Sequence, residues 1–219
     1  MKKVIVTGAN RGIGLELCRL YSERGDQVTA LCRSHSNELR DLDVSVLEGI
    51  EITDAGAIGG LAQTLRGQHF DCLIVNAGIL EPDRLASLDY ESIERQFRVN
   101  AMGSLRVVEA LIPNLPRGSC IALMTSRMGS IEDNSSGGYY GYRMSKAALN
   151  IMGKSLSIDL APVGISVAIL HPGMVGTQMT QGHGIHPALA AANLIERIDG
   201  LRASDSGTFW HAEGEVLPW

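Results

Sequence analysis

Tyr142 and Lys146 stand four residues apart in the stretch Tyr-Arg-Met-Ser-Lys. Residues at i and i+4 share one face of a helix, so this spacing would bring a phenol and an ammonium together. A tyrosine with an ordinary pKa of about 10 is a poor base at neutral pH, but a neighbouring cation stabilises the phenolate and moves that pKa toward a useful range. The pair therefore suits proton transfer. The alternative is a core tyrosine beside a surface lysine, because this spacing also recurs by chance.

Three glycines near the start of the chain form a second candidate functional motif. Gly8, Gly12 and Gly14 follow the apolar run at 4–6 and lead into a segment of helical period. In a dinucleotide-binding turn the first glycine permits a tight bend, the second admits backbone N–H groups to a pyrophosphate, and the third lets the helix pack closely. The amino end of the helix adds partial positive charge. A purely structural turn is the alternative, but the position directly after the first apolar run favours dinucleotide binding.

The end of the second apolar run indicates which dinucleotide would bind. A cofactor with free ribose hydroxyls calls for Asp or Glu there, because a carboxylate accepts both hydroxyl protons. The sequence instead has Cys32 and Arg33, with Arg11 inside the glycine turn as a second cation. Guanidinium groups bind a 2′-phosphate through forked, charge-assisted hydrogen bonds. We therefore expect NADP(H) to be favoured over NAD(H), unless Arg33 is only a solvated surface charge.

The elements that must position these residues alternate along the chain. Short apolar, β-branched runs are typical of buried parallel strands, and the longer segments between them have helical period. The expected strands are 4–7, 27–32, 44–48, 72–76, 119–125 and 165–171, and the expected helices are 13–24, 55–65, 90–111 and 142–160. This alternation predicts a doubly wound α/β sheet that binds ligands at the carboxyl ends of its strands.

Composition narrows the class of protein. The 219 residues include 45% hydrophobic and 20% charged residues, which is ordinary for one globular domain. A formal net charge of −5 gives no positive field for a phosphate backbone, so no nucleic-acid partner is expected. Cys18, Cys32, Cys72 and Cys120 are widely spaced, which favours buried thiols over a disulfide framework. Without a run that resembles a secretory leader or a membrane span, we expect no membrane partner and cytoplasmic residence.

Six motifs occur in the order seen in the short-chain dehydrogenases/reductases, and the chain resembles that superfamily over essentially its whole length. They are Thr7-Gly8-x3-Gly12-Ile13-Gly14, Asn76-Ala77-Gly78, Asn100, Ser126, Tyr142-x3-Lys146 and Pro172-Gly173-x3-Thr177. The stretch 125–160 and the ending 207–219 most resemble the branch of the C-factor and Sniffer-type carbonyl reductases. The resemblance implies a single Rossmann-type domain, 1–219, with a mostly parallel, seven-stranded, doubly wound sheet, helices on both faces and a short substrate loop near 177–188.

The resemblance also implies a catalytic set. Tyr142 would donate a proton to a carbonyl oxygen in reduction, or remove one from an alcohol in oxidation, and Ser126 would hydrogen-bond the same oxygen. Lys146 would lower the tyrosine pKa and hold the nicotinamide ribose, while Asn100 would hold a water that links Lys146 to solvent. Ser130 is a rival for the serine role, because Ser126 precedes Tyr142 by an unusually long interval. For Asn100 the alternative is a helix asparagine that bonds its own backbone.

Other residues would contact the cofactor if the resemblance holds. Asn76, Ala77 and Gly78 would line the adenine ribose, although Gly78 also suits a strand-end turn. Thr177 and the backbone of Val175 would hold the nicotinamide carboxamide. The full expected cofactor-binding set is Gly8, Asn10, Arg11, Gly12, Ile13, Gly14, Arg33, Asn76, Ala77, Gly78, Tyr142, Lys146, Pro172, Gly173, Val175 and Thr177.

Two features fit the motif pattern less well. Glu51 follows the third expected strand where an Asp is usual in the superfamily, which leaves the adenine contact open. His183 and His186 have no further His or Cys nearby and lie in a glycine-rich loop, so we expect solvated loop histidines and no metal site.

We expect an oxidoreductase that uses NADPH to reduce a ketone or aldehyde to an alcohol, with a small carbonyl or alcohol compound as its substrate. Two alternatives stay open: a nucleotide-binding signalling protein of C-factor type with little turnover, and an isomerase or epimerase that uses its cofactor transiently. The short stretch after residue 177 argues against the isomerase. The resemblance further implies a homodimer or homotetramer that pairs helices 90–111 and 142–160, with outward candidates Met102, Leu105, Ile151 and Met152.

Overall fold

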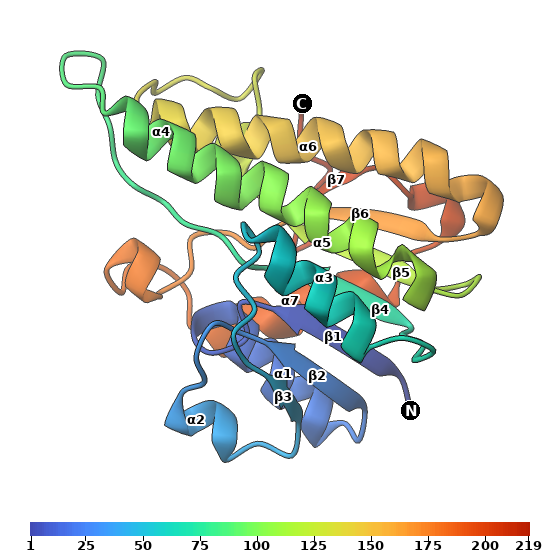
Figure 1. The fold of residues 1–219 in the computed structure, drawn as a ribbon. Helices are drawn as coiled ribbons and strands as arrows, with labels where there is room; N and C mark the ends of the chain where they lie inside the picture. Colours follow the sequence, from blue (N-terminus) through green and yellow to red (C-terminus); the bar gives the residue numbers. More distant parts are fainter.

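Seven parallel strands form one sheet in the computed structural model, which describes residues 1–219. They are β1 (Lys3–Thr7), β2 (Gln27–Leu31), β3 (Ser45–Leu47), β4 (Cys72–Val75), β5 (Cys120–Met124), β6 (Ser166–His171) and β7 (Phe209–His211). Their order is β3-β2-β1-β4-β5-β6-β7, and every pairing is parallel. Figure 1 shows helices on both faces of this sheet, so the expected doubly wound α/β fold is confirmed.

The strands are short and continuously apolar because both faces of the sheet are covered. All four residues of β4 are buried, as are the last four of β1. The six strands expected from apolar runs all occur, with ends shifted by one residue at most. The seventh, β7, has only three residues, too few to show a strand pattern in the sequence. It is recognised by its pairing, in which Phe209 lies opposite Ile169.

One face of the sheet carries α3 (Ala55–Thr64), α4 (Tyr90–Phe97), α5 (Ser104–Leu111) and α6 (Tyr140–Leu160). Side chains such as Ile58, Val107 and Leu149 form a buried cluster with the strand residues that face them. Figure 1 shows α6 running alongside α4. Helix α6 begins two residues before the expected start, which puts Tyr142 within its first turn.

The opposite face carries α1 (Gly12–Glu23) and α7 (Pro187–Asp199), with the short helix α2 (Asn37–Arg40) beside them. Val6, Leu17 and Leu194 belong to the cluster that these helices bury. Helix α7 is not among the helices predicted from periodicity. Its start is marked by Pro187 at the first helical position, where a missing N–H costs nothing. The expected substrate loop therefore ends inside the first turn of α7.

The segment expected as one helix, 90–111, is interrupted in the middle. Residues Arg98–Gly103 form a π-helical stretch between α4 and α5. Asn100 lies in this stretch and is completely buried. Gly103 lets the stretch press against its neighbour, since a Cβ on Gly103 would lie 2.9 Å from Ile52 Cγ1. Such π-bulges occur often at functional sites, so the interruption directs attention to Asn100.

Short 3-10 turns complete the connections at Ile112–Asn114, Arg127–Gly129, Ala161–Val163, Gln178–Thr180 and Ala203–Asp205. No helix combines the length and the hydropathy that crossing a lipid bilayer requires.

Candidate active site

A cavity of about 920 Å³ opens at the carboxyl ends of the strands, where the strand order reverses between β1 and β4. This crevice is where open α/β sheets bind ligands, and small-molecule pockets commonly reach roughly 1,000 Å³. Most of the expected site residues line it: Gly8, Asn10, Arg11, Gly12, Ile13, Arg33, Asn76, Ala77, Gly78, Tyr142, Lys146, Pro172 and Thr177. The others are not part of its wall: Gly14, Asn100, Ser126, Gly173 and Val175.

The glycine turn has a shape that side chains would not fit. Gly8 and Gly12 have φ values of 65° and 56°, in the left-handed region that favours glycine. A Cβ on Gly14 would lie 2.2 Å from the Gly8 carbonyl oxygen, and one on Gly8 would lie 2.9 Å from the Ala77 Cα. The turn is therefore a tight cradle packed against the end of β4, as a dinucleotide site requires.

The amino end of α1 lacks a side-chain cap. Its N-cap residue, Arg11, makes no capping hydrogen bond through its side chain, and the first turn contains no acidic residue. Arg11, Gly12 and Ile13 all line the cavity. Helices α2, α3, α4 and α7 differ, because each begins with a side chain that accepts a first-turn N–H. The N–H groups of α1 and its dipole are thus available to an anionic group.

Two arginines stand where a 2′-phosphate is expected, and both have partners. Arg33 follows β2 with 71% of its side chain exposed, and its guanidinium lies 3.5 Å from a carboxylate oxygen of Glu51. Arg11 donates to the side chain of Gln178. Glu51 also lines the cavity, so its carboxylate competes with any anion for Arg33. The competition is weak, because exposed ion pairs contribute little.

Asn76 ties the ends of two strands together across the switch point. Its Nδ2 donates to the carbonyl oxygens of Thr7 (3.1 Å) and Gly8 (3.2 Å), and its backbone N–H donates to the Thr7 hydroxyl (2.9 Å). The same hydroxyl accepts the N–H of Ala77 at 3.1 Å. Asn76 therefore has a structural role in addition to its place on the cavity wall. Sequence reasoning missed the Thr7 hydroxyl, whose only signal is its position directly before Gly8.

Tyr142, Ser126 and Lys146 come together where the end of β5 meets α6. Ser126 lies beside the Tyr142 phenol, and all three side chains are buried. The Nζ atom of Lys146 lies 5.7 Å from the centre of the Tyr142 ring and donates to the Met124 carbonyl oxygen at 2.9 Å. The phenol and the ammonium thus share one face of one helix, as their spacing predicts.

Burial moves the pKa values of these two groups in opposite directions. It raises the pKa of Tyr142 to about 12, and the neighbouring Ser126 hydroxyl offsets only part of this rise. It lowers the pKa of Lys146 from 10.5 to about 8. The expected lowering of the tyrosine pKa by the neighbouring cation is not found, because a low-dielectric site disfavours both charged forms. A phenol that keeps its proton at neutral pH is suited to act as an acid.

The two candidate serines have different surroundings. Ser126 Oγ accepts the N–H of Met128 at 3.1 Å and contacts the phenol of Tyr142. Ser130 Oγ instead accepts the N–H of Asp133 at 3.0 Å, within the following loop. Ser126 is therefore the serine that meets Tyr142, despite the long interval between them in the sequence.

Asn100 uses its side chain on a distant segment and not on its own backbone. Its Oδ1 accepts the N–H of Ile79 at 2.8 Å, and its Nδ2 donates to the Ile79 carbonyl and to Ser145 Oγ, both at 2.9 Å. A Cβ on Gly78 would lie 3.1 Å from Asn100 Oδ1 and 3.5 Å from Lys146 Nζ. Asn100 and Lys146 thus meet around Gly78, and the locally bonded alternative is wrong.

The loop after β6 forms the remaining wall. Thr177 lines the cavity and begins the turn Gln178–Thr180, while Val175 is buried behind it. His183 contacts the Thr180 carbonyl at 3.0 Å. His186 has a cap role that the sequence pattern did not suggest, because its ring accepts the N–H of Ala188 at 3.2 Å. The two histidines therefore serve local turns.

Comparison with known sequences finds a family match and similar proteins. The family model described as short chain dehydrogenase matches residues 2–186. A Rhodococcus sp. (strain AD45) protein named 1-hydroxy-2-glutathionyl-2-methyl-3-butene dehydrogenase is 40% identical over 226 residues, covering 100% of both chains. The C-signal protein of Myxococcus xanthus is 43% identical over 153 residues, covering 68% of this chain and 92% of that protein.

Solved structures also match over the whole chain. The carbonyl reductase Sniffer of D. melanogaster has a TM-score of 0.91 and 27% identity, with 100% of both chains covered. An NADPH-bound carbonyl reductase from chicken fatty liver has the same TM-score and identity, with 100% of this chain and 99% of that chain covered.

Proposed function

The chain belongs to the short-chain dehydrogenase family, and we propose that it uses NADPH to reduce a ketone or aldehyde to an alcohol. Family membership makes it an NAD(P)-dependent oxidoreductase of small molecules, and the resemblance to the C-factor and Sniffer-type branch is confirmed. The proposal that Tyr142 donates a proton is supported by its burial, which raises the pKa of the phenol to about 12 and keeps it protonated at neutral pH. Residues 1–219 act as a single domain, with 177–188 as the substrate loop.

Tyr142 and Ser126 act on the same substrate oxygen. Bound NADPH supplies a hydride to the carbonyl carbon. Ser126 donates a hydrogen bond to the carbonyl oxygen and stabilises the negative charge that develops there. Tyr142 donates its phenolic proton to that oxygen as the alcohol forms. The nearness of the two side chains supports this assignment, because both must reach one atom.

Lys146 and Asn100 support the proton donor. Lys146 lines the cavity, where its ammonium holds the nicotinamide ribose and stabilises the phenolate left after proton donation. Asn100 packs against the same glycine, Gly78, as Lys146. It is therefore placed to hold a water through which Tyr142 regains its proton.

The remaining cofactor contacts follow the cavity wall. The glycine cradle and the uncapped end of α1 hold the pyrophosphate, with Asn10 and Ile13 at its edge. Asn76, Ala77 and Gly78 line the adenine side, and Pro172, Gly173, Val175 and Thr177 form the nicotinamide side. The cradle supports this fit, because added Cβ atoms on Gly8 and Gly14 would collide with the surrounding backbone.

Arg11 and Arg33 favour NADPH over NADH by binding the 2′-phosphate. A charge-assisted hydrogen bond contributes about 1.5 to 3 kcal/mol, so two of them favour NADPH by roughly 100-fold. Titration with NADPH and NADH at low and moderate salt measures this ratio. Arg33→Asp should reduce or invert it, whereas Arg40→Asp, an equal change in charge on the exposed end of α2, should not. Equal binding of the two cofactors by the unaltered protein would contradict the assignment.

The reaction itself is tested with a panel of aldehydes, ketones, quinones and acyl-carrier ketoesters and each reduced nicotinamide. Stoichiometric loss of NADPH with formation of an alcohol is the expected result. The Rhodococcus relative, 40% identical over its whole length, supports a second candidate, oxidation of a hydroxyalkyl glutathione conjugate. That compound belongs in the panel with NADP⁺ and NAD⁺. Its turnover, with none of the carbonyl compounds reduced, would replace the first proposal by the second.

A signalling role with little turnover is favoured by the likeness to the C-signal protein. The arrangement of Ser126, Tyr142 and Lys146 argues for chemistry, since a protein that only binds the nucleotide does not need a buried acid beside it. Absence of turnover with every compound, together with tight NADPH binding, would support the signalling role.

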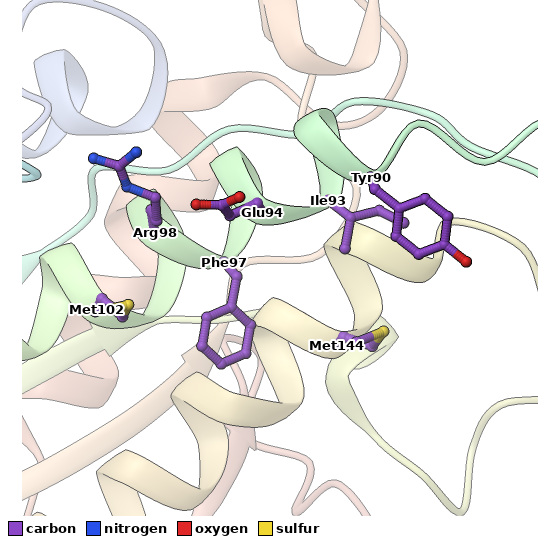
Figure 2. Close-up of a pocket in the computed structure, with 7 residues that line it drawn as sticks. All are labelled: Tyr90, Ile93, Glu94, Phe97, Arg98, Met102 and Met144. Atoms are coloured by element: carbon purple, nitrogen blue, oxygen red, sulfur yellow. The ribbon is translucent and has the colours of Figure 1, made fainter.

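The face formed by α4 and α6 is the proposed contact between copies of the chain. Tyr90, Ile93 and Phe97 on α4 and Met144 on α6 surround an apolar hollow of about 580 Å³, as Figure 2 shows. Of the four outward candidates, Met102, Leu105 and Ile151 are exposed. Met152 is half-buried, with part of its side chain packed against the core cluster under α6.

A two-fold axis would bury this apolar face, with Glu94 and Arg98 among the residues that line it. Light scattering at micromolar concentration should give the mass of a dimer or tetramer. A monomer mass would contradict the assembly and leave the proposed chemistry untouched.

A further inference from the structure

The amino end of α6 carries the proposed proton donor but has no cap of its own. Its N-cap residue, Tyr139, has a left-handed backbone with φ of 52° and makes no capping hydrogen bond through its side chain. Gly137 and Gly138 also have positive φ, so three successive left-handed residues lead the chain into the helix. A non-glycine residue in this region costs about 1 kcal/mol or more and persists only where its surroundings hold it.

Asp83, in the segment between β4 and α4, supplies the missing cap. Its Oδ1 accepts the N–H of Tyr140 at 2.5 Å and its Oδ2 accepts the N–H of Gly141 at 2.8 Å. Its main-chain carbonyl accepts the N–H of Tyr139 at 3.1 Å. The Asp83 side chain is buried, and a buried carboxylate on the first N–H groups of a helix makes strong, charge-assisted bonds. Tyr142 is the next residue after this anchor.

The segment that carries Asp83 is fastened along the neighbouring helix at alternate residues. Asn100 binds both backbone groups of Ile79, and Gln96 binds the N–H of Glu81 at 3.0 Å and its carbonyl at 3.1 Å. Asn100 and Gln96 are four residues apart and completely buried. Because Ile79 and Glu81 line the cofactor cavity, a continuous strap runs from the cavity wall to the start of α6.

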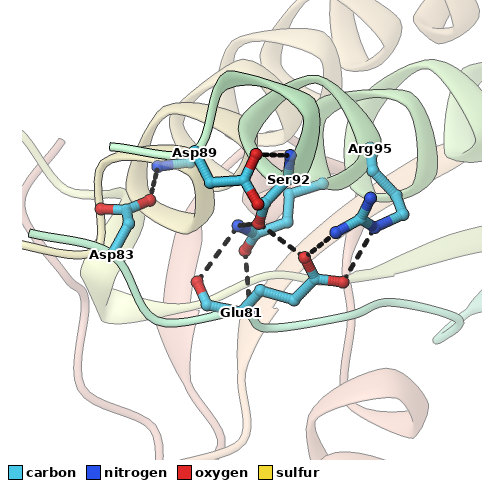
Figure 3. Close-up of polar contacts among 7 residues, drawn as sticks. Glu81, Asp83, Asp89, Ser92 and Arg95 are labelled. Carbon is cyan, nitrogen blue, oxygen red and sulfur yellow. Dashed lines mark hydrogen bonds and ion pairs between the residues drawn. The ribbon is translucent and has the colours of Figure 1, made fainter. Parts of the chain in front are cut away.

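Figure 3 shows how the outer part of the strap is held. The Glu81 carboxylate accepts hydrogen bonds from Ser92 at 2.5 Å and from Arg95 Nε at 3.0 Å, and Asp83 follows two residues later on the same segment. These contacts keep the pKa of Glu81 below its usual range, with Arg95 as the main cause. The strap is therefore anchored on α4 independently of α6.

Gly141 makes the contact between strap and helix close. A Cβ at this position would lie 2.7 Å from Gln96 Nε2 and 3.2 Å from Asp83 Oδ2. The start of α6 thus touches α4 and the strap without room for a methyl group. Its position relative to the cavity wall is fixed by packing as well as by hydrogen bonds.

We propose that Asp83 is a positioning residue for the reaction, which caps α6 from the cavity wall and thereby sets where the Tyr142 hydroxyl meets the substrate oxygen. This inference rests on the proposed function, because it takes Tyr142 as the proton donor. Asp83 itself does not line the cavity, so it acts through α6 and not on the reacting atoms. A displacement of about 1 Å costs up to about 100-fold in rate, so losing the anchor should lower kcat and not cofactor affinity.

The test compares Asp83→Ala and Asp83→Asn with Asp54→Ala. Asp54 is a matched control because its Oδ1 also accepts two first-turn N–H groups, those of Gly56 (2.6 Å) and Ala57 (3.0 Å), at the start of α3. We expect Asp83→Ala to lower kcat about 10-fold or more while the Kd for NADPH changes less than about 2-fold. Asp83→Asn, which keeps an acceptor oxygen, should recover much of kcat. Asp54→Ala should lose stability but keep kcat.

Hydrogen exchange read at residues 140–144 supplies a measurement that does not depend on turnover. Faster exchange there in Asp83→Ala, and not in Asp54→Ala, is expected. If the unaltered protein reduces no carbonyl compound, the proposed function fails while exchange still reports whether Asp83 holds the helix. If the unaltered protein is active and folded Asp83→Asn and Asp83→Ala retain its kcat, the positioning role is wrong. Equal loss of kcat in Asp54→Ala would also overturn it.

Discussion

Helices α1 and α6 both contribute to the wall of the cavity, but their amino ends are finished in opposite ways. At α1 the N-cap residue Arg11 is extended and its side chain makes no cap, so the first N–H groups remain free of side-chain partners. At α6 the N-cap residue Tyr139 is left-handed, and Asp83 reaches from another segment to occupy the first N–H groups. Four of the other helices have ordinary local caps.

This difference fits two requirements of the proposed reaction, which are cofactor binding and proton donation. A mobile, charged cofactor needs an amino end whose N–H groups and dipole are unused until it binds. A proton donor needs a helix whose position is fixed before the substrate arrives, because proton transfer depends on short distances. We therefore infer that the uncapped end of α1 contributes to cofactor affinity, whereas the capped end of α6 positions the proton donor for the chemical step. The predictions below test this separation, beginning with the largest effect.

Removing the hydroxyl of Tyr142 should have the largest effect on turnover. In Tyr142→Phe the proton donor is gone while the glycine cradle and α1 are unchanged. We expect kcat to fall by about 100-fold or more and the Kd for NADPH to stay within about 2-fold. Steady-state kinetics and a fluorescence titration measure the two quantities on the same sample.

Tyr139→Phe is the control, because it removes a phenol three residues earlier that does not line the cavity. It should retain full activity. Retention of more than about a tenth of the activity in Tyr142→Phe would move the acid role to another residue.

A capping side chain at the amino end of α1 should have the opposite effect, weakening NADPH binding and leaving kcat nearly unchanged. Arg11→Asp places a capping carboxylate where the phosphates are expected and removes a cation. The Kd for NADPH should rise by roughly 10- to 100-fold, while kcat at saturating NADPH changes little. Arg66→Asp, an equal change in charge at an exposed position after α3, should leave both values unchanged. An unaltered Kd in Arg11→Asp would show that the end of α1 does not hold the cofactor.

Substituting Lys146 should have a smaller effect, on the free energy of unfolding, because its buried ammonium destabilises the folded protein. Its pKa is lowered from 10.5 to about 8 by burial, so below pH 8 the folded protein holds a cation that the unfolded chain leaves in water. Between these values the unfolded chain binds more protons, and this group makes the wild-type protein more stable as the pH rises. Lys146→Met should therefore raise the free energy of unfolding at pH 7 by about 1 to 2 kcal/mol, after allowing for the lost bond to Met124.

Urea unfolding at several pH values measures this difference. The advantage of Lys146→Met should shrink as the pH rises from 8 to 10.5, and above that range the wild type should be the more stable protein because it keeps the bond to Met124. An advantage that is constant across this window would mean that burial of the charge is not its cause.

Most of the fold is predictable because its signals are local. Apolar runs placed six strands within one residue, and the spacing of Tyr142 and Lys146 placed both on one helix face. Elements without a local pattern were missed, namely the three residues of β7 and helix α7. The π-helical stretch at Arg98–Gly103 was also missed, because no local residue pattern marks it; in the fold, Gly103 packs closely against Ile52.

The site was less predictable wherever a role depends on a residue distant in the sequence. Asp83 has no motif, and its role appears only when the strap meets α6. Arg33 pairs with Glu51 from a different loop, and no sequence motif predicts that these two residues meet. The pKa of Tyr142 was expected to be low from its cationic neighbour, but depth of burial, which the sequence does not report, raises it. Met152 is half-buried against the core cluster, which the sequence does not report either.

The separation between binding and chemistry is tested most directly by measuring NADPH affinity and turnover side by side in the wild-type protein, Tyr142→Phe and Arg11→Asp. With a reducible carbonyl compound and saturating NADPH, Tyr142→Phe should bind NADPH as the wild type does and lack turnover. Arg11→Asp should bind NADPH weakly and keep kcat. If each variant instead loses both NADPH affinity and kcat, α1 and α6 do not have separate roles in binding and proton transfer, and the proposed separation is wrong.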